Sequence, residues 1–187
     1  MNHALADSRG HVGMCCLIAA EAAIFTIFVV AYLFYVGKSV AGPTPADVLQ
    51  LPVFATICLL SSSLTVHAGV SALRNGNVPG FARWWLATLA LGSVFLAATM
   101  IEWRRLIYVE GLTIRTNLFG TTYFSLVGLH AFHVTAGLVG LTLGTTLAVL
   151  GYVTPFHASR GGVFSLYWHF VDVVWIVVFL VVYVAGR

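Results

Sequence analysis

Ionisable side chains inside long apolar segments are the residues of this sequence that could do chemistry. His169 and Asp172 stand in an apolar run together with Trp168 and Trp175. At about 100° per residue, Trp168, Asp172 and Trp175 fall on one stripe of a helix, and His169 lies beside it. An aspartate at the centre of a membrane helix costs about 2.5–3.5 kcal/mol on insertion scales. We therefore predict that this stripe faces protein and finds polar partners on other helices.

Three further ionisable residues lie deep in apolar segments: Glu21, His130 and His133. Glu21 could handle protons or contact lipid, and the alternative is a structural hydrogen bond that fixes helix register. The two histidines share a helix face, where they could ligate haem or a metal, or bond to Glu21, to backbone carbonyls or to each other. Alanines flank Glu21 and permit close helix contact, so we predict a bond from Glu21 to His130 or His133.

A second group of polar and aromatic residues is typical of anchors at the membrane surface. A carboxylate, a tryptophan and two arginines follow one another at the end of the third apolar segment, and tryptophan is enriched at membrane interfaces. His67 is interpreted as a packed or interfacial histidine, and Arg115 and Asn117 as contacts to lipid headgroups. The residues interpreted as interface anchors are Glu102, Trp103, Arg104, Arg105, Trp168 and Trp175.

The composition places all these residues in a membrane. The chain has 187 residues, of which 60% are hydrophobic and only 8% charged, whereas soluble domains carry about 25% charged residues. A net charge of +3 with scattered basic residues gives no cluster that would bind nucleic acid. We predict an all-α fold, a polytopic transmembrane bundle of five helices in a single domain, 1–187. The expected spans are about 12–36, 52–73, 83–103, 118–153 and 163–185.

Details of these spans give further expectations. The first is too long for the apolar region of a signal peptide, so it is predicted to be a retained helix. The fourth is longer than a bilayer requires and should tilt, protrude or bend near Gly137 and Gly140. Gly137, Gly140 and Gly144 share a face, and this pattern, like the serines at 61–63, favours close helix contact. The three cysteines, Cys15, Cys16 and Cys58, are interpreted as small buried filler.

Charge does not orient the bundle. Four basic residues lie on the N-terminal side of the five spans (Arg9, Arg74, Arg83 and Arg160), and five lie on the other side (Lys38, Arg104, Arg105, Arg115 and Arg187). The positive-inside rule needs a larger asymmetry to decide.

Four stretches resemble subunit III of the haem-copper oxidases, in the same order along the chain. The most specific is Tyr-Trp-His-Phe-Val-Asp-Val-Val-Trp at 167–175, which is similar to the C-terminal helix signature of that family. The others are Gly13-Met14 followed by Glu21, the segment 91–103 that ends in Glu-Trp, and the segments 119–124 and 128–134. Thr99 departs from the pattern, because members often carry glutamine there.

The resemblance implies an accessory subunit of the five-helix form found in bacteria. Such a subunit carries no catalytic residue, metal or cofactor of its own; haem and copper belong to subunits I and II. It packs on subunit I, binds phospholipid in a cleft, and supports proton uptake and enzyme stability while the complex reduces oxygen to water and translocates protons. The resemblance also implies the bacterial cytoplasmic membrane and a cytoplasmic N-terminus, with Glu21 at the position of the buried glutamate of the family.

Three alternatives remain from the sequence. One is the related small subunit of a nitric oxide reductase, and another is a haem-binding cytochrome that uses His130 or His133. The third is a stand-alone proton-coupled transporter that uses Glu21 and Asp172, although the inverted repeats frequent in such transporters are not visible. The electron donor of an oxidase, cytochrome c or quinol, also stays open.

Overall fold

The computed structural model describes residues 2–39 and 41–186, with side chains from residue 9 onward. Five stretches are long and apolar enough to cross a membrane, and no strand occurs among these residues. The predicted all-α membrane bundle is therefore confirmed. The elements are α1 Asn2–Tyr35, α2 Pro45–Val48, α3 Val53–Arg74, α4 Val78–Tyr108, α5 Leu118–Val149, the 3₁₀ turn η1 Pro155–His157, α6 Ala158–Phe179 and the π-helical turn η2 Leu180–Ala185.

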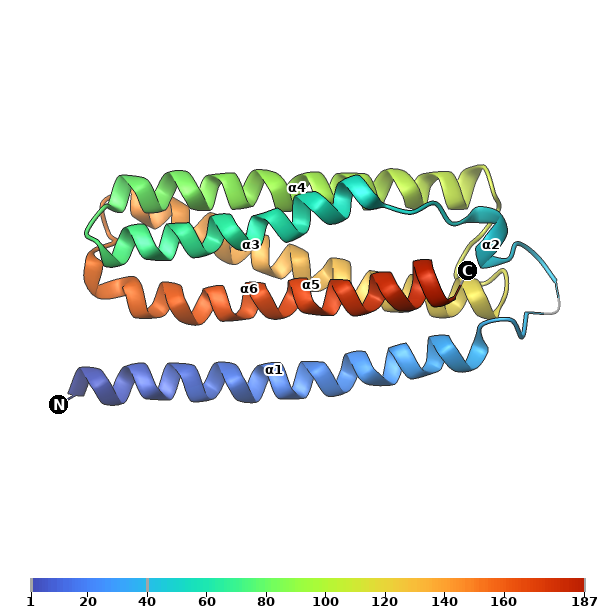
Figure 1. The fold of residues 1–187 in the computed structure, drawn as a ribbon, viewed down its shortest axis with the longest axis horizontal. Coiled ribbons are helices and arrows are strands. Elements are labelled where there is room, and N and C mark those ends of the chain that lie inside the picture. Colours follow the sequence, from blue (N-terminus) through green and yellow to red (C-terminus); the bar gives the residue numbers. More distant parts are fainter. Residues whose placement is uncertain (1, 40, 187) are drawn as a thin grey trace.

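Four of the long helices, α3 to α6, run side by side, and α1 lies along the outside of this group against α5 and α6 (Figure 1). The N-terminus and the turns after α3 and α5 lie at one end of the bundle. The short helix α2, the connection after α4 and the C-terminus lie at the other end (Figure 1). The chain thus crosses from end to end five times.

The helix ends differ from the predicted spans for local reasons. α4 begins at Val78 rather than at 83, because the Asn77 side chain accepts a hydrogen bond from the Gly80 amide at 2.8 Å and Pro79 fits the first turn of a helix. α5 ends at Val149 rather than at 153, because Gly151, two residues later, takes a φ of +81° and terminates the helix. α6 begins at Ala158 rather than at 163, so the glycines at 161–162 lie inside the helix.

The glycine face of α5 packs directly on aromatic rings, which confirms the predicted close contact. A Cβ atom added to Gly137 would lie 2.5 Å from the ring of Trp168. A Cβ atom added to Gly140 would clash with the ring of Phe164, and one added to Gly144 would clash with the ring of Trp85. Because no larger residue fits without displacing a ring, these glycines set the distance between α5 and its neighbours.

The first helix meets the bundle along a narrow stripe, and this corrects the interpretation of two cysteines. The stripe includes Glu21, Phe25 and Tyr32, of which Phe25 and Tyr32 are 4% and 0% exposed. Cys58 on α3 is buried as predicted, but Cys15 and Cys16 are exposed. Their positions lie off the stripe, so they point away from the other helices.

Candidate functional site

Glu21 on α1 bonds to His133 on α5, as one of the two predicted pairings requires. Its Oε2 lies 3.0 Å from Nε2 of His133. Nδ1 of the same imidazole is 2.8 Å from the carbonyl oxygen of Leu129, one turn earlier. The Tyr167 hydroxyl of α6 donates to the backbone carbonyl of His133 at 3.0 Å. One residue of α5 therefore joins α1 and α6.

The hydrogen bonds also limit the net charge that Glu21 and His133 carry together. A carbonyl oxygen only accepts, so Nδ1 of His133 carries a proton and donates it to Leu129. The proton between Nε2 and Glu21 then sits on one or the other atom. Either a carboxylate faces an imidazolium, or a carboxylic acid faces a neutral imidazole. Both arrangements have no net charge, which removes most of the cost of placing Glu21 inside a membrane.

His130, the second predicted partner of Glu21, takes a different place. Its side chain is fully buried, and its ring lies 4.9 Å from that of Trp175 and 5.7 Å from that of Phe95. Within the described part of the chain, neither ring nitrogen has a hydrogen-bond partner. The prediction for the histidine pair thus holds for His133 alone, while His130 packs among aromatic rings.

The stripe of α6 faces α3, which confirms that it points inward. Trp168 donates its indole N–H to the Ser62 hydroxyl at 2.8 Å. Trp175 donates to Thr56 at 3.1 Å. We call this contact region the α3–α6 seam; it consists of Thr56, Ser62 and Ser63 on α3 and Trp168, His169, Asp172 and Trp175 on α6.

Asp172 and His169 share one partner in this seam. The Ser63 hydroxyl hydrogen-bonds to Oδ2 of Asp172 and lies 2.9 Å from Nδ1 of His169. Asp172 is only 3% exposed. The sequence singled out the serines at 61–63 for their size, and their second role as hydrogen-bond partners of α6 was missed. A run of hydroxyl residues on one helix, opposite an Asp and two Trp on another, is the signal that could have found it.

The interface-anchor interpretation is wrong for Trp168 and Trp175. Their side chains are 0% and 1% exposed, so neither ring is available to contact lipid. The reason is that hydroxyls on α3 satisfy both indole N–H groups inside the protein. Trp103 is also turned inward: its ring packs on Phe124 at 5.5 Å between ring centres, and its indole nitrogen is covered. Arg104 is exposed, so its anchor role remains a prediction.

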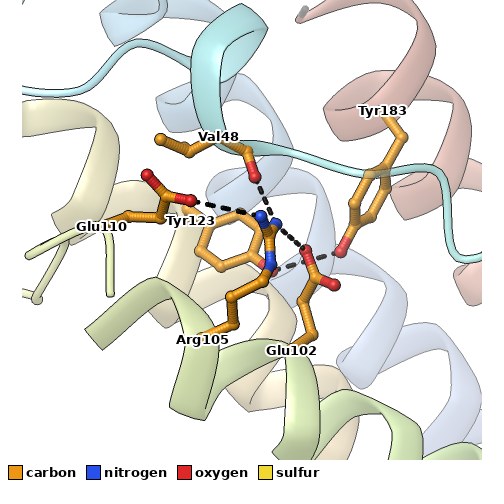
Figure 2. Close-up of polar contacts among 6 residues, drawn as sticks. All are labelled: Val48, Glu102, Arg105, Glu110, Tyr123 and Tyr183. Atoms are coloured by element: carbon orange, nitrogen blue, oxygen red, sulfur yellow. Dashed lines mark hydrogen bonds and ion pairs between the residues drawn. The ribbon is translucent and has the colours of Figure 1, made fainter. Parts of the chain in front are cut away.

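Arg105 connects α4 to the segment before α3 (Figure 2). Its guanidinium donates to the backbone carbonyl of Val48 in α2, to Glu102 at 3.2 Å and to Glu110 at 3.3 Å. Glu102 and Arg105 are both partly buried, at 17% and 26% side-chain exposure. They were expected to face headgroups from the end of a span. α4 instead continues to Tyr108, and this pair fixes α2 against the bundle.

Two further features at this end were missed or misread from the sequence. The hydroxyls of Tyr123 and Tyr183 lie 3.2 Å apart beside the Arg105 group, in a buried link between α5 and η2 (Figure 2). No sequence pattern pairs them. Asn117, expected at headgroup level, caps α5 by accepting from the Gly120 amide at 2.7 Å. Its amide also donates to two carbonyls of the connection after α1.

The helix α2 was also not predicted, although Thr44, Pro45 and Asp47 form a recognisable start signal. The Asp47 carboxylate accepts from the Thr44 hydroxyl and from its backbone amide at 3.2 Å, as in a capping box. These hydrogen bonds hold the pKa of Asp47 below its ordinary value.

Among the side chains that the structure describes, those of residues 9–39 and 41–186, no group of three or more His, Cys, Asp or Glu is arranged to hold a metal ion. The polar groups described above instead join one helix to the next. Their chemistry is that of hydrogen bonding and proton sharing.

Comparison with known protein families identifies the family of this chain. Residues 2–187 match the family described as cytochrome c oxidase subunit III. The chain belongs to this family. The resemblance seen in the sequence is therefore confirmed. Members of this family are subunits of an oxidoreductase complex, so the chain belongs in a complex with the other oxidase subunits.

Curated relatives cover most of the chain. It is 42% identical over 180 residues to cytochrome c oxidase subunit 3 of Synechocystis sp., which covers 91% of this chain and 73% of the relative. It is 34% identical to the subunit of the same name from Bacillus sp., over 99% of this chain and 90% of the relative. It is also 33% identical to cytochrome bo(3) ubiquinol oxidase subunit 3 of Pseudomonas putida, over 94% of this chain and 85% of the relative. The relatives thus include both cytochrome c and ubiquinol oxidase subunits.

Proposed function

We propose that this chain is the accessory subunit III of a haem-copper terminal oxidase. It packs on the catalytic subunit I, beside subunit II, and those partners hold the haem and copper that reduce oxygen to water. The observation that carries this proposal is the match to the subunit III family along the whole chain. Similarity to both cytochrome c and ubiquinol oxidase subunits leaves the electron donor to be determined by the partner subunits.

The state of the polar groups supports a non-catalytic role. Glu21 is bonded to His133, and Asp172 to Ser63. Each of these bonds joins two transmembrane helices, and His133 and Asp172 are buried between them. The groups therefore serve the cohesion of the bundle, which is what an accessory subunit needs.

We also propose that the subunit binds phospholipid between α1 and α6. A cleft of about 240 Å³ lies there, with Phe25 and Val29 on one wall and Phe170, Val174 and Val178 on the other. Its lining is apolar except for the hydroxyl of Thr26. Such a surface suits an acyl chain, because hydrocarbon fills it without leaving a polar group unsatisfied. Lipid in this cleft would add to the support of α1, which meets α5 and α6 along a narrow stripe.

The bond between Glu21 and His133 supports a role in enzyme stability and proton uptake. It is a polar link that joins α1 to α5 within their membrane-spanning segments. Replacing Glu21 by alanine is expected to loosen the subunit from the complex or to shorten the working life of the enzyme, while its haem content stays normal. Cys16→Ala, which changes an exposed side chain of α1 outside the cleft, is the matched control. Loss of haem in the Glu21 variant would contradict an accessory role.

The proposed location is the bacterial cytoplasmic membrane, with the N-terminus in the cytoplasm. Five spanning helices and bacterial oxidase relatives fit a multi-pass protein of that membrane. A cysteine placed at Arg115, in a background without native cysteines, is expected to react in whole cells with a reagent that does not cross membranes. A cysteine at Arg9 is expected to stay unreacted, and the reverse pattern would invert the orientation.

Deletion of the chain tests the function as a whole. The oxidase that remains is expected to keep its haem spectrum, to take up protons more slowly and to lose activity sooner during turnover. An oxidase whose turnover, proton uptake and lifetime are all unchanged would refute the proposed role.

A further inference from the structure

The α3–α6 seam contains an unbroken chain of hydrogen bonds that ends on a buried carboxyl group. Nε2 of His169 lies 3.2 Å from the Ser165 hydroxyl, and Nδ1 lies 2.9 Å from the Ser63 hydroxyl. Ser63 is in turn hydrogen-bonded to Oδ2 of Asp172. Ser165 and Asp172, at the two ends of this chain, are 6% and 3% exposed. Oδ1 of Asp172 has no hydrogen-bond partner in the described part of the chain.

Two arrangements of protons satisfy every bond in this chain. In the first, Asp172 is ionised: Nδ1–H of His169 donates to Ser63, and Ser63 donates to Asp172. Nε2 of His169 then accepts from Ser165. In the second, Asp172 is protonated: its Oδ2–H donates to Ser63, Ser63 donates to Nδ1, and Nε2–H donates to Ser165. Both arrangements use the same heavy-atom positions, and they differ by one proton.

We propose that Ser165, His169, Ser63 and Asp172 form a proton wire that takes up one proton and holds it on Asp172. A proton arrives at Nε2 of His169 and forms a new N–H bond. Nδ1 then gives its proton to the Ser63 oxygen, which gives its own proton to Oδ2 of Asp172. The net change is one proton gained by the carboxylate, with His169 neutral before and after but in the other tautomer. No electron is transferred.

The direction of uptake follows from the placement of these groups. Ser165 is one turn nearer than His169 to the start of α6, and that end of the bundle also holds the end of α3 (Figure 1). His67, on α3, is exposed and lies one turn after Ser63, toward that same end of the bundle. Protons therefore enter the wire from that side. Asp172 lies deeper in the bundle, near the middle of α6.

No cationic side chain among the described residues neutralises Asp172, so its charge changes by gaining or losing a proton. From α6 the titratable neighbour is His169, and α3 contributes the Ser63 hydroxyl, which bonds to both side chains. α5 contributes the uncharged region around His130, whose ring packs on Trp175. Glu21 of α1 is occupied by its own histidine partner. The ion pairs among the described residues lie elsewhere, and no arginine or lysine bonds to Asp172.

Infrared difference spectroscopy of the full chain in lipid nanodiscs tests this wire without the oxidase. Spectra taken at stepped pH are expected to show a C=O stretching band of a protonated carboxyl group, which disappears in Asp172→Asn. Asp47→Asn is the matched control, because Asp47 is exposed at the end of the bundle, and the band should survive there. Circular dichroism checks that both variants keep their helices. Identical pH-dependent C=O spectra of the native chain and of Asp172→Asn would overturn the proposal, as would the absence of any such band in the native chain.

A second variant tests the wire itself and leaves the carboxyl group in place. Ser63→Ala removes the oxygen between His169 and Asp172. The Asp172 band is expected to shift in frequency, and its hydrogen–deuterium exchange to slow by a factor of about 5 to 10, the ratio that about 1–1.4 kcal/mol of lost hydrogen bonding gives. Ser61→Ala on the same helix is the control. Exchange as fast in Ser63→Ala as in the native chain would show that protons reach Asp172 by another route. Because these measurements need no partner subunit, their outcome is independent of the proposed oxidase role.

Discussion

Replacing Gly137 by alanine is expected to destabilise the bundle, although alanine is the better helix former. The added Cβ would lie 2.5 Å and 2.8 Å from two carbon atoms of the Trp168 ring. That ring is 0% exposed, and its N–H is held by Ser62 at 2.8 Å, so it has little freedom to move aside. Overpacking of this kind costs about 1–3 kcal/mol. Replacing a glycine by alanine in a helix interior by itself stabilises by about 0.5–1 kcal/mol, which leaves a net loss of up to about 2.5 kcal/mol.

Unfolding of the purified chain in mixed micelles, followed by circular dichroism as the fraction of denaturing detergent rises, measures this loss. Gly13→Ala on α1 is the matched control, because a Cβ there meets no atom within 4 Å. It is expected to be neutral or slightly stabilising. In the double variant Gly137→Ala with Trp168→Phe, the smaller ring should make the two losses less than additive. If Gly137→Ala is as stable as Gly13→Ala, the packing of α5 on Trp168 is not as described.

Three further predictions concern polar contacts. Glu21→Gln removes the charge-assisted bond to His133 and is expected to cost about 1–3 kcal/mol in the same unfolding assay. A double-mutant cycle with His133→Gln isolates that term. Arg105→Gln frees α2 from α4, so protease cleavage within 45–48 should become faster while the unfolding midpoint of the bundle changes little. The Thr44 hydrogen bonds that lower the pKa of Asp47 stabilise α2 when Asp47 is ionised. Protection of the α2 amides is therefore expected to persist at neutral pH and to fall as the pH drops through that lowered pKa.

The controls for these predictions come from neighbouring residues. Arg104→Gln removes an exposed charge one position from Arg105, and protease cleavage of α2 should be unaffected. Equal cleavage rates in the two arginine variants would contradict the connection of α4 to α2. Thr44→Val removes the hydroxyl that donates to Asp47, so acid should then have a smaller effect on α2. Additive losses for Glu21→Gln and His133→Gln would show that these two side chains do not interact.

The sequence predicts the helices well because their signal is long and redundant. Each span needs about twenty apolar residues, so a few polar positions inside it do not hide it. The ends were less predictable, since they depend on single residues. Two helix ends differ from the predicted spans because Asn77 caps the start of α4 and Gly151 terminates α5. The short helix at 45–48 was missed because four residues carry no periodic pattern and only its cap identifies it.

For the candidate site, too, some features could be predicted from the sequence and others could not. That Asp172 faces inward follows from the cost of burying a carboxylate in lipid, and that Glu21 needs a histidine follows from the same argument. Which histidine it chooses does not follow, because His130 and His133 share one face of α5. The choice depends on the rotation of α5 against α1, which the whole bundle determines. Trp168 was misplaced at the membrane surface because the rule for tryptophan describes lipid contact, and the rule does not apply to an indole whose N–H is satisfied inside the protein.

Mass spectrometry of the proteins that copurify with this chain in mild detergent tests the central claim most directly. The proposed function predicts a large polytopic partner with haem-ligating histidines, together with a partner that carries a copper site, in equal amounts with this chain. The identity of the complex would also reveal whether cytochrome c or quinol is the donor. A chain that purifies with lipid alone, from membranes in which the oxidase is intact, would contradict the account.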